Sequence, residues 1–367
     1  MISRWLWRLA WLLLPAAWAL HHLVHNDALT FLAACLSLVP LARTMGNATE
    51  SLAERMGPAA GSLLNASFGN AAELILGLSA LRHGHLGLVK GSITGSILGN
   101  LLLVAGASIV AGGVKFKRLR FNRLAASSSI STLFLAVIAL AVPTLLASAG
   151  GARAPAGILS VEISAVLLVM YGLSLLFQLR THAAHMGRER EPLHATPAEA
   201  AGAAAQQGAP HAPAEGPGSA LLQLVLAAAA TAFASELLIA ALGGALVQLH
   251  LPETFVGVII VAIVGNAAEH STALLFARKG DLDVALGIAW ESSKQIALFV
   301  APVLVFSGLA LGVPMDLAFT RFEVIALGLA VIALSLIVLD GETHWLEGAF
   351  LLAVYTVLGM GFYFVGP

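Results

Sequence analysis

The stretch VGVIIVAIVGNAAEHSTALLFA, residues 256–277, decides the fold of this protein. It is apolar enough to lie in a lipid bilayer except at its centre, which carries Asn266, Glu269 and His270. A second stretch, LNASFGNAAELILGLSAL at residues 64–81, has the same Gly-Asn-Ala-Ala-Glu in an equally apolar setting. A carboxylate at the centre of a spanning helix costs about 2.5 kcal/mol or more unless it is paired, protonated or hydrated. Two such carboxylates therefore indicate a functional site.

The composition is typical of a polytopic membrane protein. The chain has 367 residues, of which 59% are hydrophobic and 11% charged, and its mean hydropathy is +0.90. These values exclude a soluble globular domain. The single cysteine, Cys35, excludes an intrachain disulfide and a multi-cysteine metal site. We expect a lipid bilayer as the environment and no nucleic acid as a partner, while the sequence leaves the oligomeric state open.

Apolar windows of roughly 20 residues predict an all-α protein with about eleven transmembrane helices. The predicted helices are 4–24, 27–55, 59–82, 86–112, 122–148, 157–180, 219–249, 254–277, 282–311, 318–339 and 345–365. We interpret residues 1–26 as a separate first helix, and residues 27–180 and 219–367 as two five-helix repeats. Residues 181–218, rich in Ala, Pro, Gly and His, are predicted to be a flexible linker.

The two halves are related by an internal repeat. A shift of 196 residues aligns residues 69–96 with 265–292, and eleven positions are identical. Five helices separate the two copies, so the third and eighth helices are expected to run in opposite directions. Inverted repeats of this kind occur in secondary transporters, which bind substrate near the bilayer midplane. The pseudo-twofold relation predicts that Glu73 and Glu269 meet at the centre.

The basic residues predict the orientation in the membrane. An eleven-helix count puts most of them on one side, namely Arg4, Arg8, Lys115 to Arg123, Arg180 to Arg190, Arg278 and Lys279. By the positive-inside rule that side is cytoplasmic, as are the N-terminus and the linker. The N-terminus lacks the Arg- and Ser-rich composition of a transit peptide, which favours a bacterial plasma membrane.

Glu73 and Glu269 are candidate ligands for a cation. A hard divalent cation binds carboxylate, amide and carbonyl oxygens. Asn70 and Asn266 lie three residues before these glutamates, on the same helical face, and each offers an amide oxygen. The small side chains of Gly-Asn-Ala-Ala permit local unwinding that would turn carbonyl groups towards an ion. The alternative interpretation is that these polar residues form hydrogen bonds between packed helices.

The helices that follow each motif carry further polar residues. Ser96 and Asn100 in the first half, and Ser292 and Gln295 in the second, are expected to reach the site. Gly91, Gly95 and Gly99 recur every four residues, which is typical of a close packing face.

The second half also contains Glu291 and Lys294. Their three-residue spacing permits an ion pair, and Lys294 could alternatively act as a positive charge beside the cation path.

Three other residues are candidates for a proton or access path. His270 could titrate, because the unperturbed pKa of histidine lies near physiological pH, although a residue adjacent to Glu269 does not share its helical face. Glu50 and Glu236, in the second and seventh helices, resemble a pair related by the repeat. Acids of this kind could line access paths or simply be paired at an interface.

The paired motifs resemble those of the calcium/proton exchanger (CAX) family of calcium:cation antiporters. The resemblance rests on SLLNASFGNAAELI with GSITGSILGNLLLVAG, and on GVIIVAIVGNAAEH with SSKQIALFVAP. It implies eleven helices, with Glu73 and Glu269 as the cation-binding and proton-exchanging acids. It also implies that Asn70, Asn266, Ser96, Ser292 and Gln295 lie nearby. The chain departs from the family pattern at Trp290, Glu291 and Lys294.

The expected function is therefore exchange of cytoplasmic Ca²⁺ for protons by alternating access, with no cofactor. The alternatives are Mn²⁺/H⁺ or Na⁺-coupled exchange on the same scaffold, and passive conduction through a cation channel. An enzymatic function is not expected, because the sequence has no H-E-x-x-H motif and Ser271 faces away from its neighbour His270.

Overall fold

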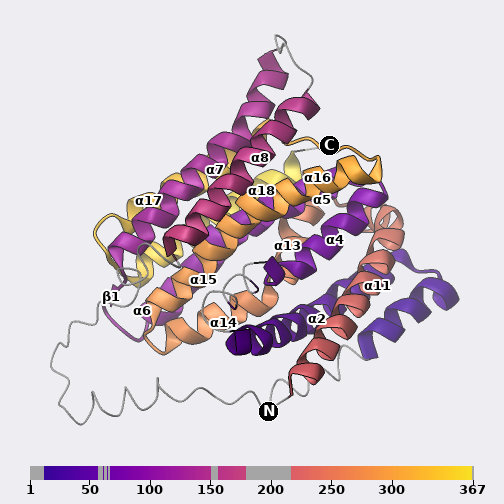
Figure 1. The fold of residues 1–367 in the computed structure, drawn as a ribbon, viewed down its shortest axis with the longest axis horizontal. Helices are drawn as coiled ribbons and strands as arrows, with labels where there is room; N and C mark the ends of the chain where they lie inside the picture. The colour runs from indigo at the N-terminus through magenta and orange to yellow at the C-terminus, as the bar shows by residue number, and fades with distance from the viewer. Residues whose placement is uncertain are drawn as a thin grey trace.

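A computed structural model describes residues 12–56, 61, 64, 67–149, 156–178 and 216–365. Nearly all of these residues are helical (Figure 1). The predicted linker, 181–218, lies outside the described residues except at 216–218, where a helix already begins. The basic residues predicted at Arg4, Arg8 and 180–190 also lie outside them.

The first half comprises two short helices, four long spans and a small strand. Its elements are the helix Leu12–Val24 ending in the π-helical turn η1 (Leu20–Val24), α2 (Asp27–Met56), α4 (Ala71–Arg82), α5 (Leu86–Leu98), η2 (Gly99–Val104), α6 (Ala105–Gly113), β1 (Leu119–Arg120), α7 (Arg123–Ala149) and α8 (Ala156–Leu176). The segments α5, η2 and α6 form one span, Leu86–Gly113.

The second half repeats the order of the long helices, but its strand β2 follows α17, whereas β1 precedes α7. Its elements are α11 (Pro217–Leu249), α12 (Glu253–Phe255), η4 (Val256–Val261), α13 (Ala262–Gly265), α14 (Ala267–Arg278), α15 (Leu282–Gln295), η5 (Ile296–Val300), α16 (Ala301–Leu311), α17 (Arg321–Val338), β2 (Glu342–Thr343) and α18 (Trp345–Phe364). The two short strands pair antiparallel, with Leu119 opposite Thr343, and so join the halves at one end.

The helix bounds agree closely with those predicted from the sequence, except in the two motif helices, 59–82 and 254–277. The predicted helix 59–82 is interrupted at Asn70, and α4 begins at Ala71. The described residues contain eight helices long and apolar enough to span a membrane, or nine if a bent pair is one span. The number eleven therefore stays a prediction. The predicted continuous helix 254–277 is instead broken, because α13 and α14 meet at Asn266 with a bend of 59°.

The internal repeat is also present in the positions at which the helices begin and end. Helices α4 and α14 are both 12 residues long and begin at positions 196 residues apart. The π-helical turns η2 and η5 interrupt equivalent spans at nearly the same offset. A π-helical turn inserts a wide turn into a helix and often occurs at functional sites. The repeat thus concerns local geometry as well as sequence.

The motif helices α4 and α14 run in opposite directions. Gly77 packs against Leu304, and Leu81 lies one turn further along beside Gly308, so α4 is parallel to α16. The span that contains α16 follows α14 after the short turn 279–281 and returns alongside it (Figure 1). These directions are those expected of inverted repeats.

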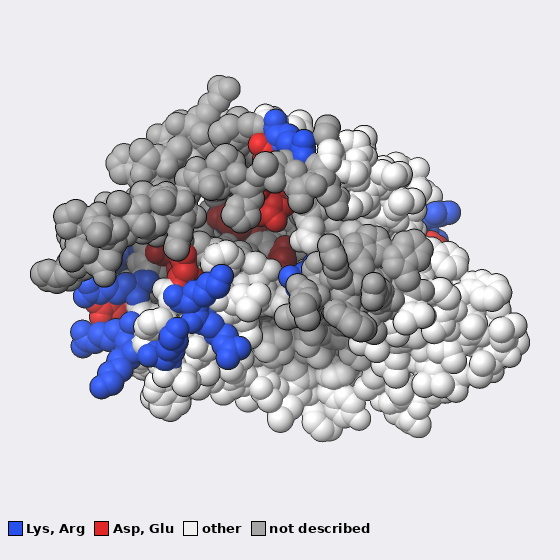
Figure 2. All heavy atoms as spheres, turned by 90° about the horizontal axis from the view of Figure 1, so that it is seen from below, with Lys and Arg blue, Asp and Glu red and all other residues white. Residues whose placement is uncertain are grey.

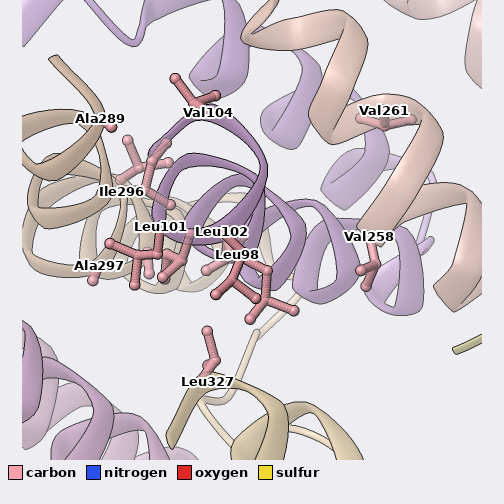
Figure 3. Close-up of a cluster of buried hydrophobic side chains, with 14 of the residues drawn as sticks. Leu98, Leu101, Leu102, Val104, Val258, Val261, Ala289, Ile296, Ala297 and Leu327 are labelled. Carbon is pink, nitrogen blue, oxygen red and sulfur yellow. The ribbon is translucent and has the colours of Figure 1, made fainter. Parts of the chain in front are cut away.

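The span that follows the first motif is the most buried of the candidate membrane spans. In the span Leu86–Gly113, 83% of the most apolar window is buried, whereas in α8 and α18 only 22% is buried. Figure 3 shows Leu98, Leu101 and Leu102 packed towards Ile296 and Ala297 of η5, with Leu327 of α17 nearby. Helices α2 and α11 lie side by side at one edge of the bundle (Figure 1).

The predicted glycine packing face is confirmed for two of its three members. A Cβ atom on Gly91 would lie 3.0 Å from the carbonyl oxygen of Thr254, and one on Gly95 only 2.1 Å from that of Val258. Gly99 has no such neighbour within 4 Å. Helix α5 therefore approaches the backbone of η4 closely enough to require glycine at two positions.

We expect Gly95→Ala to destabilise the protein, because the new methyl group would meet a backbone oxygen that has no room to move. Overpacking of this kind costs about 1–3 kcal/mol. The melting temperature of the detergent-solubilised protein should fall. Gly99→Ala, in the same span but with open space around its Cβ position, is the control. Equal melting temperatures for the two variants would contradict the packing described.

Candidate functional site

Both Gly-Asn-Ala-Ala-Glu motifs lie at helix starts inside the protein. Asn70 precedes α4 with φ −101° and ψ 25°, and Asn266 precedes α14 with φ −93° and ψ 6°. This conformation lies outside the regular helical region, so each asparagine interrupts its span. The local unwinding predicted for the small residues is present. Glu73 and Glu269 consequently lie in the first turns of helices that begin in the middle of the molecule.

The side-chain amides of these asparagines cross between the two halves. The Asn70 amide nitrogen donates to the Gln295 side-chain oxygen. The Asn266 amide nitrogen donates to the Ser96 hydroxyl at 2.9 Å. In a third such contact the Asn100 amide nitrogen donates to the Ser292 hydroxyl, also at 2.9 Å. The structure therefore brings six of the predicted polar residues together in reciprocal pairs.

These contacts leave acceptor oxygens without donors. Asn70 Oδ1, Asn266 Oδ1 and Glu269 Oε2 are all buried, and none accepts a hydrogen bond. Asn70 and Asn266 are at most 1% exposed, so water does not compensate freely. A buried acceptor without a partner costs about 1–3 kcal/mol. The arrangement is thus suited to a ligand that needs oxygen donors, which is the chemistry of a hard cation.

A cavity of about 440 Å³ contains the two glutamates. Glu73, Glu269, Ser292 and Gln295 all line it. The Glu73 carboxylate lies against Gly265, with its Oε1 atom 3.7 Å from the position that a Cβ would occupy. The Ser292 hydroxyl is close enough to Glu269 to donate a hydrogen bond. The predicted convergence of the two carboxylates is consistent with this shared cavity.

The described residues contain no group of three or more His, Cys, Asp or Glu side chains placed to hold a metal ion. The two glutamates are instead accompanied by amide and hydroxyl groups. Such a shell, with only two formal negative charges, suits a cation that must be released again.

The cavity extends towards the basic end of the protein. Thr272 lines it between Glu269 and the basic end of α14, and Glu50 lines it from α2. Lys115 donates to the backbone oxygen of Arg278 at 3.5 Å, so the two predicted basic segments meet there. Figure 2 shows Lys and Arg side chains gathered at one end of this face and acidic side chains in a hollow beside them.

On the opposite side of the glutamates there is far less space. A cavity of about 20 Å³ lies there, lined by Glu73, Ser96, Leu38 and Leu76. The site is therefore connected mainly to one side of the protein.

The structure separates the predicted access residues. Glu50 lines the large cavity, whereas Glu236 does not. Glu236 accepts a hydrogen bond from Ser79 at 2.9 Å and lies 3.6 Å from the His83 ring nitrogen, at the other end of α4. His270 does not line the cavity, and its Nε2 atom is buried without a partner.

The predicted pair of Glu291 and Lys294 is present. The Lys294 ammonium contacts the Glu291 carboxylate, and Glu291 also lines the large cavity. The neighbouring Trp290 is 4% exposed and packs edge-on against Phe121, with ring centroids 6.2 Å apart. Trp290 thus anchors α15 and points away from the cavity lining.

Sequence reasoning missed a polar stripe on α2. Arg43 and Asn47 line the cavity together with Glu50. Their spacing of four and three residues puts them on one helical face within an apolar span. That spacing was the signal that could have identified them.

Comparison with known proteins gives consistent matches over most of the chain. A family model described as "Sodium/calcium exchanger protein" matches residues 27–180 and 219–364. A Ca(2+)/H(+) antiporter from Aphanothece halophytica is 41% identical over 355 residues, covering 94% of this chain and 93% of the relative. The Ca(2+)/H(+) antiporter ChaA of Bacillus subtilis is 41% identical over 345 residues, covering 92% of each. The solved structure of native YfkE matches with a TM-score of 0.81 and 36% identity, covering 98% of this chain and 100% of that one.

We expect Ca²⁺ to raise the melting temperature of the detergent-solubilised protein, because the unpartnered oxygens would gain a ligand only in the folded state. A ligand at about 100 times its Kd stabilises by about 2.7 kcal/mol. Glu73→Gln should remove most of this shift, and a chelator should reverse it. Glu342→Gln, which alters a surface acid paired with Arg118 and Arg120, is the control. A shift that survives Glu73→Gln would exclude the site.

Proposed function

Because the chain belongs to the sodium/calcium exchanger protein family, we propose that it is an antiporter that exchanges cytoplasmic Ca²⁺ for protons. The protein is a membrane transporter and not an enzyme. Ca²⁺ and protons are the ions named for the relatives that it resembles over more than nine-tenths of its length. Exchange of one ion for another in this family needs no cofactor.

The observation that carries this proposal is the set of unpartnered oxygens beside two glutamates. Asn70 Oδ1, Asn266 Oδ1 and Glu269 Oε2 have no donors, and Glu73 shares the cavity. Carboxylate and amide oxygens can bind a divalent cation, and the two negative charges of the glutamates would balance its two positive charges. In the absence of the cation, protons can neutralise the same carboxylates. One site thus serves both ions.

Coupling follows from this competition. Ca²⁺ bound between Glu73 and Glu269 excludes the protons that would neutralise them, and two protons exclude Ca²⁺. The number of protons exchanged for each Ca²⁺ is a property of the coupled pair of glutamates, not of either residue alone. A carrier of this kind cannot return empty without leaving two unpaired charges in the membrane, which is strongly unfavourable.

Alternating access would move the opening from one side of the site to the other. The large cavity extends towards the basic end, which the positive-inside rule assigns to the cytoplasm. The described conformation is then the one that takes up cytoplasmic Ca²⁺. Helices α2 and α11 pack together at the edge of the bundle and carry Glu50 and Glu236. We propose that they move against the core spans and open the Glu236 side in the other state.

The same reasoning gives the location of the protein and its orientation in the membrane. It spans a membrane, and we propose the bacterial plasma membrane, with the N-terminus and the linker 181–218 in the cytoplasm. In that orientation the inward proton gradient would drive Ca²⁺ out of the cell.

The proposal is tested in proteoliposomes with an imposed pH gradient, by following Ca²⁺ uptake and internal pH together. The native protein should accumulate Ca²⁺ while protons move in the opposite direction. Glu269→Gln should lower the exchange rate by about 100-fold, which corresponds to about 2.7 kcal/mol of lost cation binding. Glu342→Gln should behave as the native protein.

Other outcomes would identify the alternatives. Ca²⁺ movement without proton movement would show a channel. Proton-coupled movement of Mn²⁺ alone, or coupling to Na⁺ in place of protons, would keep the scaffold and change the substrate.

The apparent KM for Ca²⁺ should depend on pH on the side from which Ca²⁺ binds. As pH falls, protons occupy the carboxylates and KM rises, whereas rising pH removes the protons and lowers KM. Each proton displaced changes KM by about tenfold per pH unit in the range where the carboxylates are protonated. The slope of log KM against pH therefore reports the number displaced. A KM independent of pH across the neutral range would contradict competition at a shared site.

A further inference from the structure

Lys294 is a buried lysine beside the candidate ligands. It lies next to Gln295 on α15, and its side chain is only 4% exposed. A buried ammonium is unfavourable unless an anion pairs with it. Its partner is Glu291, whose Oε1 atom contacts the Lys294 nitrogen. The pair thus supplies the charge compensation that burial of Lys294 requires.

Glu291 occupies the cavity between its mouth and the inner site. Its side chain is 42% exposed and lines the cavity with Glu50. It lies four residues before Gln295 on the same helical face, hence about 6 Å nearer the basic end. Both carboxylate oxygens also lie 3.3 Å from the Gln178 amide nitrogen, which donates to them. A cation that reaches Glu73 and Glu269 through this cavity therefore shares the cavity with this carboxylate.

The pair is a feature of the second half alone. The positions 196 residues earlier are Gly95 and Leu98, which carry no charge. The inverted repeat therefore does not require an acid and a base at this point. The pair has the same net charge as those two neutral residues, because Lys294 cancels the charge of Glu291.

We propose that Lys294 is a tethered cation that neutralises Glu291 and so sets the affinity and charge selectivity of the cation path. This inference rests on the proposed function and adds a selectivity residue to it. Without Lys294, the charge of Glu291 would attract a divalent ion with twice the energy of a monovalent one. Lys294 accordingly weakens the binding of Ca²⁺ more than that of Na⁺, and it shortens the time that Ca²⁺ stays in the cavity.

The test compares the KM and kcat for Ca²⁺ of four variants in proteoliposomes. Lys294→Met frees Glu291 and should lower KM by about fivefold at low ionic strength, with a smaller effect at high salt. Its effect on inhibition by Na⁺ should be smaller. Lys294→Arg keeps the charge and should keep the native KM. The double variant Glu291→Gln/Lys294→Met restores the native net charge and should also return KM to the native value.

The fourth variant, Lys294→Gln, keeps a hydrogen-bond donor towards Glu291 and should lower KM as Lys294→Met does, even if the methionine variant fails to fold. An unchanged KM in the folded neutral variants, or the same low KM in the double variant, would overturn the inference. A native protein that exchanges no Ca²⁺ for protons would instead overturn the proposed function, so the two failures are distinguishable.

Discussion

The reciprocal hydrogen bonds of Asn70 and Asn266 are the constraint on which the rest of the structure depends. Each asparagine interrupts a span and directs its amide nitrogen to a residue of the other half, Gln295 or Ser96. An asparagine side chain has both donor and acceptor atoms, so donation across the interface fixes the acceptor oxygen on the opposite side of the amide. The bonds that join the halves therefore leave the acceptor oxygens of both asparagines without partners.

This arrangement explains why the core and the site coincide. The spans α5–α6 and α15–α16 pack at the centre, and close approach between α5 and η4 requires Gly91 and Gly95. Close packing excludes water from one side of the glutamates, where only about 20 Å³ remains. On the other side α2 contributes polar residues, and the cavity is about 440 Å³. A site open mainly to one side is what a carrier needs in each of its two states.

Much of this could be predicted from the sequence. Apolar windows gave helix bounds close to those observed, because a bilayer imposes its thickness on every span. The repeated motif predicted inversion, because an odd number of helices reverses direction, and it predicted that Glu73 and Glu269 lie close together, which agrees with the cavity that both line. The spacing of Glu291 and Lys294 permitted the ion pair that the structure contains. These features depend on local periodicity or on simple counting.

Other features were decided only by the tertiary structure. Helical spacing cannot tell that Glu50 lines the large cavity while Glu236 pairs with His83 at the other end of α4, because that depends on which side of the bundle is closed. Helical spacing also cannot tell that His270 lies outside the cavity lining with its Nε2 atom buried, or that Asn100 donates a hydrogen bond to Ser292 across the interface. The sequence by itself determined the membrane-spanning class, the bounds of most described helices and the repeated motif that carries Glu73 and Glu269. Only packing between the halves decided which polar atoms are satisfied and which are left for an ion, since hydrogen-bond partners distant in sequence are set by three-dimensional contact.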